Sequence, residues 1–217
     1  TCALPISYHE NILEWIKIAN EYKIPTFVLG VGLGGLIILN LLEKTELPIE
    51  GILLFSPMLE LKRDYKGCKN KLISNVGKIS KDTRFKVGIT PQDLTRNDEI
   101  IEETANDGLM LKKVTYSWYN LINEKMKETM DHIRDIKPIS ALIMYGTNDK
   151  ILETQSINEM KDKLKSKEMY FKVWDGLYHE IHNEPERDLV MRYVLSFLNN
   201  SVNTMGFIVN EEEIEDI

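Results

Sequence analysis

The first quarter of the chain alternates between helix-like and strand-like apolar patterns. Apolar residues recur at helical spacing over residues 12–19, and Pro25 then precedes a β-favouring run over residues 26–29. Four glycines follow within six residues, residues 36–44 again favour a helix, and a second mostly apolar run ends at Ser56. Two buried strands joined through a tight turn and a helix predict a βαβ unit, and hence a parallel sheet.

The middle of the chain differs in amino-acid composition from its two ends. From residue 62 to about residue 134, Lys, Asp and Asn become dense and apolar residues thin out, with helix-like patches over residues 98–105 and 109–130. We interpret this segment as a mostly helical insertion. After this segment, strand-like and helix-like patterns alternate again. Strands are expected over residues 141–145 and 170–174, and helices over 156–164 and 186–198.

These patterns predict one α/β unit with an insertion and a tail. The expected divisions are a core over residues 1–61, the helical insertion over 62–134, the rest of the core over 135–200, and an acidic tail over 201–217.

The first six residues do not resemble a natural start. The chain begins with Thr1, and no charged or apolar leader region follows. Residues 1–6 back-translate as ACG TGT GCT CTT CCG ATC, which reads like the end of a common sequencing adapter. We therefore expect these residues, Cys2 included, to be adapter-derived and the chain to be the carboxyl-terminal part of a longer protein. The alternative is a mature terminus left by processing.

Composition excludes several classes of protein. The 217 residues have a formal net charge of −7, but five acidic residues lie within 211–217, so the body is nearly neutral and lacks the basic excess of a nucleic-acid binder. Two cysteines, Cys2 and Cys68, cannot form a disulfide framework, which favours the reducing cytoplasm. Glycines interrupt the long apolar stretch over residues 26–42, so we expect no transmembrane segment. Abundant Lys, Ile and Asn suggest AT-rich coding DNA, as in a low-GC bacterium.

The glycine turn permits two interpretations. Residues 30–35, Gly-Val-Gly-Leu-Gly-Gly, satisfy the dinucleotide pattern G-x-G-x-x-G between a strand and a helix. A dinucleotide site also requires an acidic residue near the end of the next strand to bind the ribose, and none is present there. The same turn matches the nucleophile elbow G-x-S-x-G, with Gly32 at the serine position. An elbow requires an acid and then a histidine after later strands, and Asp149 and His179 follow the expected strands in that order.

Several separate stretches resemble one family. Residues 27–35, 54–59, 93–98 and 178–186 resemble motifs of the monoacylglycerol lipase and lysophospholipase group of α/β-hydrolases, often labelled serine aminopeptidase-like. The resemblance implies an α/β-hydrolase fold, a mostly parallel sheet flanked by helices, that lacks the N-terminal strands. It makes residues 62–134 a helical cap over an acyl-binding site.

The same resemblance assigns roles to individual residues. It implies that Asp149 is the triad acid and His179 the triad base, and that the Leu33 N–H stabilises the oxyanion. Gly30 and Gly34 would permit the sharp elbow turn. The chain departs from the family at Gly32, which replaces the nucleophilic serine, and at Val31, which replaces a histidine. The loop that supplies the second oxyanion donor is absent with the early strands.

The implied reaction is carboxylic-ester hydrolysis of a lipid-like acyl substrate, without a cofactor or metal. Because Gly32 has no atom that attacks a carbonyl, we expect activity to be lost or weak. The competing interpretation is a non-catalytic protein that binds acyl ligands. A metal site at His182 lacks a third ligand with convincing spacing, and Cys68 is expected to be a surface or packing residue. Trp118 and Tyr119 either line the cap cavity or simply pack.

Overall fold

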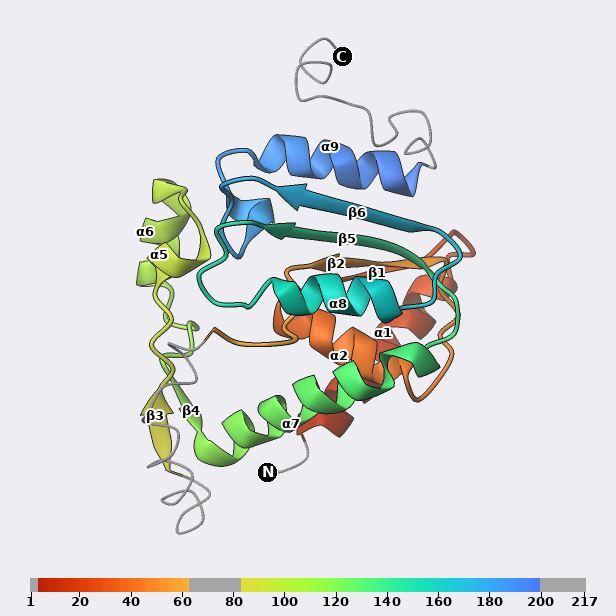
Figure 1. The fold of residues 1–217 in the computed structure, drawn as a ribbon, viewed down its shortest axis with the longest axis horizontal. Helices are drawn as coiled ribbons and strands as arrows, with labels where there is room; N and C mark the ends of the chain where they lie inside the picture. Colours follow the sequence, from red (N-terminus) through yellow and green to blue (C-terminus); the bar gives the residue numbers. More distant parts are fainter. Residues whose placement is uncertain (1–3, 63–82, 200–217) are drawn as a thin grey trace.

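The structure is a computed structural model that describes residues 4–62 and 83–199 (Figure 1). Both cysteines, Cys2 and Cys68, and the acidic tail over residues 201–217 lie outside the described residues, so the predictions for them remain predictions. None of the helices within the described ranges is long and apolar enough to cross a membrane.

Within residues 4–62 and 83–199, four parallel strands form the central sheet. They are β1 (Phe27–Val31), β2 (Gly51–Phe55), β5 (Ser140–Gly146) and β6 (Met169–Trp174), in the order β1-β2-β5-β6. Every residue of β2 is buried, as expected for an inner parallel strand covered on both faces. The α/β architecture predicted from the apolar pattern is therefore confirmed.

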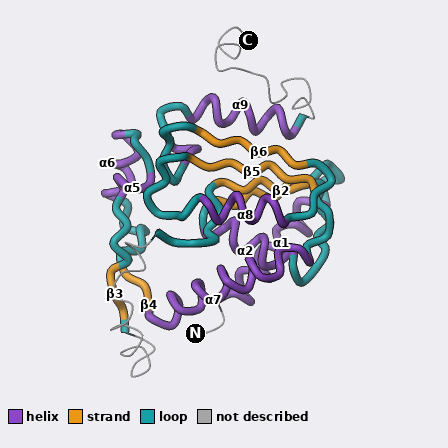
Figure 2. Tube along the Cα trace, viewed as in Figure 1, coloured by secondary structure: helices purple, strands orange, loops and turns teal. Residues whose placement is uncertain are grey.

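Helices cover both faces of this sheet. Figures 1 and 2 show α9 (Arg187–Leu198) on one face, and α1 (Leu4–Asn20), α2 (Leu33–Leu42), α7 (Tyr116–His132) and α8 (Gln155–Lys163) on the other. Helices α8 and α9 lie within one residue of their expected bounds, as helix ends usually do. Helix α2 begins three residues and ends two residues before its expected bounds, and α1 begins eight residues before the helical pattern at residue 12.

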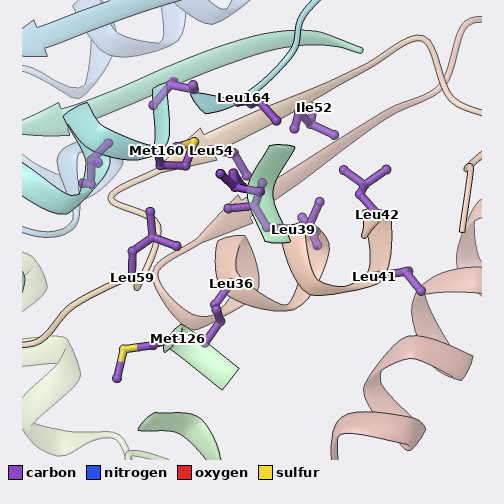
Figure 3. Close-up of a cluster of buried hydrophobic side chains, with 14 of the residues drawn as sticks. Leu36, Leu39, Leu41, Leu42, Ile52, Leu54, Leu59, Met126, Met160 and Leu164 are labelled. Atoms are coloured by element: carbon purple, nitrogen blue, oxygen red, sulfur yellow. The ribbon is translucent and has the colours of Figure 1, made fainter. Parts of the chain in front are cut away.

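The larger apolar core lies on the face that four helices cover. Figure 3 shows α2 in its centre, with Leu39 on the side of Ile52 and Leu54 of the sheet and Leu36 on the side of Met126 of α7. A second cluster lies under α9 and includes Phe55, Leu142 and Phe197. Packing on both faces holds each strand in place. The ends of the strands in turn position the candidate site.

The insertion contains short strands as well as helices. It includes α5 (Pro91–Leu94) and α6 (Asp98–Asn106), and β3 (Arg84–Lys86) pairs antiparallel with β4 (Lys113–Thr115). The predicted helix over residues 109–130 was therefore wrong for its first seven residues. The Thr115 hydroxyl accepts a hydrogen bond from the Trp118 N–H at 3.2 Å and so caps α7, which starts the helix at residue 116.

The aromatic pair at the start of α7 packs. Tyr119 is 7% exposed in the core and meets the Phe85 ring edge to face at 5.4 Å between centroids. Trp118 lines a small apolar cavity between α1, α2 and α7, together with Tyr8 and Leu36.

The helices of the insertion lie in two different places. Helix α7 packs against α2 of the core, whereas α5 and α6 lie beyond the ends of β5 and β6 (Figure 1). The boundary of the cap at residue 134 therefore stays a prediction.

Candidate active site

The turn after β1 holds Gly32 in a conformation that favours glycine. Its φ is +51° and its ψ is −114°, a region that costs other residues about 1–3 kcal/mol. The Gly32 N–H donates to the Phe55 carbonyl at 3.0 Å, and its own carbonyl accepts from the Met58 N–H at 2.9 Å. These bonds tie the turn to the end of β2, so its position is fixed by the sheet.

The neighbouring glycines differ in how strictly they are required. A Cβ at Gly30 would lie 2.7 Å from the Gly34 carbonyl carbon and 2.7 Å from the Gly35 nitrogen, so the close passage of helix α2 over the strand end requires a glycine there. A Cβ at Gly34 would meet nothing within 4 Å. Leu33 is the first residue of α2, so its N–H lies at the amino end of the helix.

Asp149 follows β5 and is fully buried. Its Oδ1 accepts from the backbone N–H groups of Ile151 and Leu152 at 2.8 and 2.9 Å, and its backbone carbonyl accepts from the Lys62 ammonium. These contacts leave Oδ2 for His179. The carboxylate is therefore oriented from one side by the backbone and presented to the imidazole on the other.

His179 follows β6 and lies between Asp149 and Gly32. Its Nδ1 is 2.8 Å from Asp149 Oδ2, and the histidine is 6% exposed. Its Nε2 points to Gly32, lying 3.0 Å from where a Cβ at Gly32 would be. The structure thus brings together the three positions that sequence reasoning selected, in the order acid, histidine, elbow.

Ser56 holds the backbone of His179. It is fully buried with φ +43°, and its hydroxyl donates to the His179 carbonyl at 2.8 Å. The hydroxyl is therefore engaged in fixing the histidine main chain. Sequence reasoning gave Ser56 no role, and its signals were its place directly after the second strand and within the motif over residues 54–59.

The loop that bears His179 also needs a glycine beneath it. A Cβ at Gly146 would lie 2.2 Å from the Leu177 carbonyl oxygen, a distance no side chain tolerates. The Asn148 N–H donates to that same oxygen at 2.9 Å. Gly146 at the end of β5 therefore lets the histidine loop cross close above the acid loop, a role that its position after a strand could have suggested.

A buried carboxylate joins the insertion to the histidine loop. Glu184 is fully buried; its Oε1 accepts from the Tyr178 N–H at 2.7 Å and its Oε2 from the Arg96 guanidinium at 2.9 Å. Nearby, the Glu180 N–H donates to the Leu94 carbonyl at 2.8 Å. Arg96 and Glu184 occurred in the quoted motifs, but no sequence signal indicated that they pair.

His182 lies beside the site without joining it. Its ring packs against Phe55 at 6.0 Å between centroids, and its Nδ1 is buried with no hydrogen-bond partner among the described residues. Burial, aided by His179 and opposed by the charge of Glu180, lowers the pKa of His182. Across residues 4–62 and 83–199, no group of three or more His, Cys, Asp or Glu side chains is arranged to hold a metal ion.

The arrangement brings a carboxylate, an imidazole and a helix end together at one edge of the sheet. A carboxylate orients an imidazole, the imidazole faces the elbow, and helix α2 directs its amino end to the same place. What the three positions lack is a hydroxyl at residue 32.

Comparison with known proteins shows the family to which the chain belongs. The family described as "Serine aminopeptidase, S33" matches residues 8–186. Phospholipase YtpA of Bacillus subtilis (strain 168) is 28% identical over 196 residues, which cover 90% of this chain and 76% of that protein. The crystal structure of Paleococcus ferrophilus monoacylglycerol lipase aligns with a TM-score of 0.75 at 23% identity, over 88% of this chain and 74% of that one.

A second solved structure shows the same fold. A soluble variant of monoglyceride lipase from Saccharomyces cerevisiae aligns with a TM-score of 0.78 at 17% identity, covering 89% of this chain and 68% of that one. At such identities the structural likeness demonstrates the fold, and the family match over most of the chain establishes the relationship. The chain belongs to the serine aminopeptidase (S33) family of α/β-hydrolases.

Proposed function

We propose that this protein is a lipase- or esterase-type hydrolase with a vacant nucleophile position, in which hydrolysis of lipid-like carboxylic esters is lost or weak. One observation supports the proposal most directly. The His179 ring is held at Nδ1 by Asp149, and its Nε2 lies 3.0 Å from the Cβ position of Gly32, which has no side chain.

The chemistry of each group follows from this geometry. In a serine hydrolase the imidazole takes the hydroxyl proton as the oxygen attacks the acyl carbon, and backbone N–H groups stabilise the oxyanion. Here His179 and Asp149 have the proton-accepting and orienting roles, and the Leu33 N–H is the oxyanion donor. With Gly32 at the elbow no covalent acyl intermediate forms, and the remaining route is slow attack by a water that His179 activates.

The second candidate function is non-catalytic binding of acyl ligands, and Gly32 favours it. The names of the relatives, a phospholipase and two monoacylglycerol lipases, support a lipid-like acyl ligand for this chain. The family match favours the elbow over a dinucleotide site at residues 30–35. The low cysteine content supports a cytoplasmic location.

Restoring the serine tests the proposal. We expect Gly32→Ser to create ester hydrolysis that disappears again when Asp149→Asn or His179→Ala is added. Because φ at this residue is +51° and a Cβ lies 3.0 Å from Nε2, the substitution costs about 1–3 kcal/mol of stability and displaces the imidazole slightly.

The assay measures release of short and long acyl chains by the wild type and the three variants. A folded Gly32→Ser protein without any gain would contradict the proposal that only the attacking atom is missing. Labelling of the wild type by an acylating serine probe, lost in His179→Ala, would show that the nucleophile lies elsewhere.

A further inference from the structure

The loop between α6 and β4 carries the two most exposed large apolar side chains of residues 4–62 and 83–199. Leu109 is 87% exposed and Leu111 is 77% exposed, whereas Met110 between them is half-buried. A single exposed leucine is ordinary on a protein surface, but apolar side chains gathered at one place mark a surface that contacts something else. This loop therefore presents apolar surface that the described part of the chain leaves uncovered.

Hydrogen bonds within the loop fix its shape. The Leu109 N–H donates to Asp107 Oδ1 at 2.7 Å, and the Met110 N–H donates to the Asp107 carbonyl at 3.3 Å. An aspartate that accepts from the backbone two residues further on stabilises a tight turn. The turn defines the backbone from which the two leucines extend, and it engages the carboxylate of Asp107.

The strand pair next to this loop has a cationic outer face. Phe85 and Val114 are register partners that pack against the core, so the residues on either side of them along each strand face outward. Three of these outward residues, Arg84, Lys86 and Lys113, are exposed cations. Lys86 lies directly opposite Lys113. Because like charges directly opposite destabilise a strand pair, the pairing of β3 with β4 does not explain them.

No carboxylate neutralises this face within the described ranges. Among the described residues, none of the exposed side chains of Arg84, Lys86, Lys112 and Lys113 forms an ion pair. Figure 1 shows β3 and β4 at one margin of the molecule, apart from the central sheet, so the helices of the core do not cover them. We call the two leucines and these four cations the insertion patch.

We propose that the insertion patch docks on the surface of a lipid bilayer that carries anionic headgroups. The leucines enter the boundary between headgroups and acyl chains, and the cations contact lipid phosphates. Such binding gains from buried apolar area and from charge attraction together. The inference goes beyond the proposed function, because it does not depend on the residue at position 32.

The charge of the whole chain makes the insertion patch decisive. With a formal net charge of −7, the chain as a whole is repelled by an anionic bilayer. Attraction must then come from a local cationic face, which acts within about 10 Å of the bilayer at ordinary salt. Binding that requires both this face and the leucines is the signature of the proposed docking.

Cosedimentation of the 217-residue chain with lipid vesicles tests the proposal. Vesicles of phosphatidylcholine with about one-third phosphatidylglycerol are compared with vesicles of phosphatidylcholine alone, and we expect binding at least about tenfold tighter to the first. Leu109→Ser combined with Leu111→Ser should weaken binding to the anionic vesicles at least about tenfold. Lys112→Gln combined with Lys113→Gln should weaken it by about as much.

Each double variant has a matched control away from the insertion patch. Leu13→Ser combined with Leu195→Ser removes two exposed leucines from α1 and α9. Lys165→Gln combined with Lys167→Gln removes two exposed lysines from the segment before β6. Both controls should bind the anionic vesicles as the wild type does. Thermal unfolding verifies that every variant is folded, as expected for exposed positions.

The outcomes separate this inference from the proposed function. No binding of the wild type, equal binding to both kinds of vesicle, or an equal loss in a variant and its control overturns the docking surface and leaves the vacancy at Gly32 standing. So does a wild type that is dimeric in analytical ultracentrifugation and becomes monomeric in the leucine variant, since a second copy would then cover the loop. Ester hydrolysis by the wild type at an enzyme-like rate overturns the proposed function alone.

Discussion

Removing the charge of Glu184 should separate the insertion from the histidine loop. This carboxylate is fully buried and has two tasks, because one oxygen accepts from the Tyr178 N–H and the other from Arg96. In Glu184→Gln the side-chain amide retains one acceptor oxygen, so its NH₂ group faces one of these donors. Either the Tyr178 N–H or the Arg96 guanidinium then loses its acceptor. Tyr178 directly precedes His179, so the loss occurs next to the histidine.

The expected cost follows from the two contacts. An unsatisfied buried N–H costs about 1–3 kcal/mol, and a hydrogen bond to a charged group contributes about 1.5–3 kcal/mol. Breaking a fully buried ion pair costs about 3–5 kcal/mol, but the Arg96 side chain is 35% exposed and retains Glu186 at 2.6 Å, so water relieves part of the loss. We expect Glu184→Gln to lower the free energy of unfolding by about 3 kcal/mol.

Glu186→Gln is the matched control, because it removes a carboxylate from the same guanidinium. The Glu186 side chain is 39% exposed, and an exposed ion pair of this kind contributes at most about 1 kcal/mol. Thermal unfolding followed by circular dichroism should show a Tm about 6–12 °C lower for Glu184→Gln and a change of less than about 4 °C for the control.

The readout at the site distinguishes positioning from stability alone. In a Gly32→Ser background, Glu184→Gln should lower kcat at temperatures where the protein is fully folded, because Tyr178 adjoins His179. Equal destabilisation by the Glu184 and Glu186 substitutions would refute the reasoning, since it would mean that burial of the carboxylate contributes nothing.

Three further substitutions test separate contacts. Burial raises the pKa of Glu43, whose Oε1 has no partner among the described residues. Ionisation therefore costs stability as the pH rises through the folded value, and Glu43→Gln should raise the Tm at pH 8 but hardly at pH 4. Burial lowers the pKa of His182, so stability should fall as the pH drops from 7.5 to 5.5, and His182→Leu should reduce that slope in urea unfolding. Gly146→Ala places a Cβ 2.2 Å from the Leu177 carbonyl oxygen and should cost about 1–3 kcal/mol in the same assay, whereas Gly108→Ala, in open space, should be neutral.

The positions of the candidate site could be predicted because they depend on short-range patterns. The strand before Gly32 and the helix after it have strong apolar signals, and Asp149 and His179 each follow another apolar strand. Since parallel strands end at one edge of the sheet, residues that follow them come together there. The order of motifs was therefore enough to select the three positions that the structure brings into contact.

The contacts that support the site could not be predicted in this way. Arg96 and Glu184 are 88 residues apart, and charged residues in a polar stretch are normally solvated, so their burial has no local signal. The β3–β4 pair was missed because its strands are three residues long and largely exposed. Over such lengths no periodicity distinguishes a strand from a loop or a helix end.

The division of the site between distant segments has a consequence for the order of folding. Asp149 and His179 are 30 residues apart and follow adjacent strands joined through α8, so both belong to the β5–α8–β6 unit. Gly32 belongs to the β1–α2–β2 unit, which meets the first only when β2 pairs with β5. Contacts within a unit close smaller loops than contacts between units, and smaller loops cost less entropy. We therefore expect the acid–histidine pair to form within its own unit, and Gly32 to join it only when the two halves of the sheet meet.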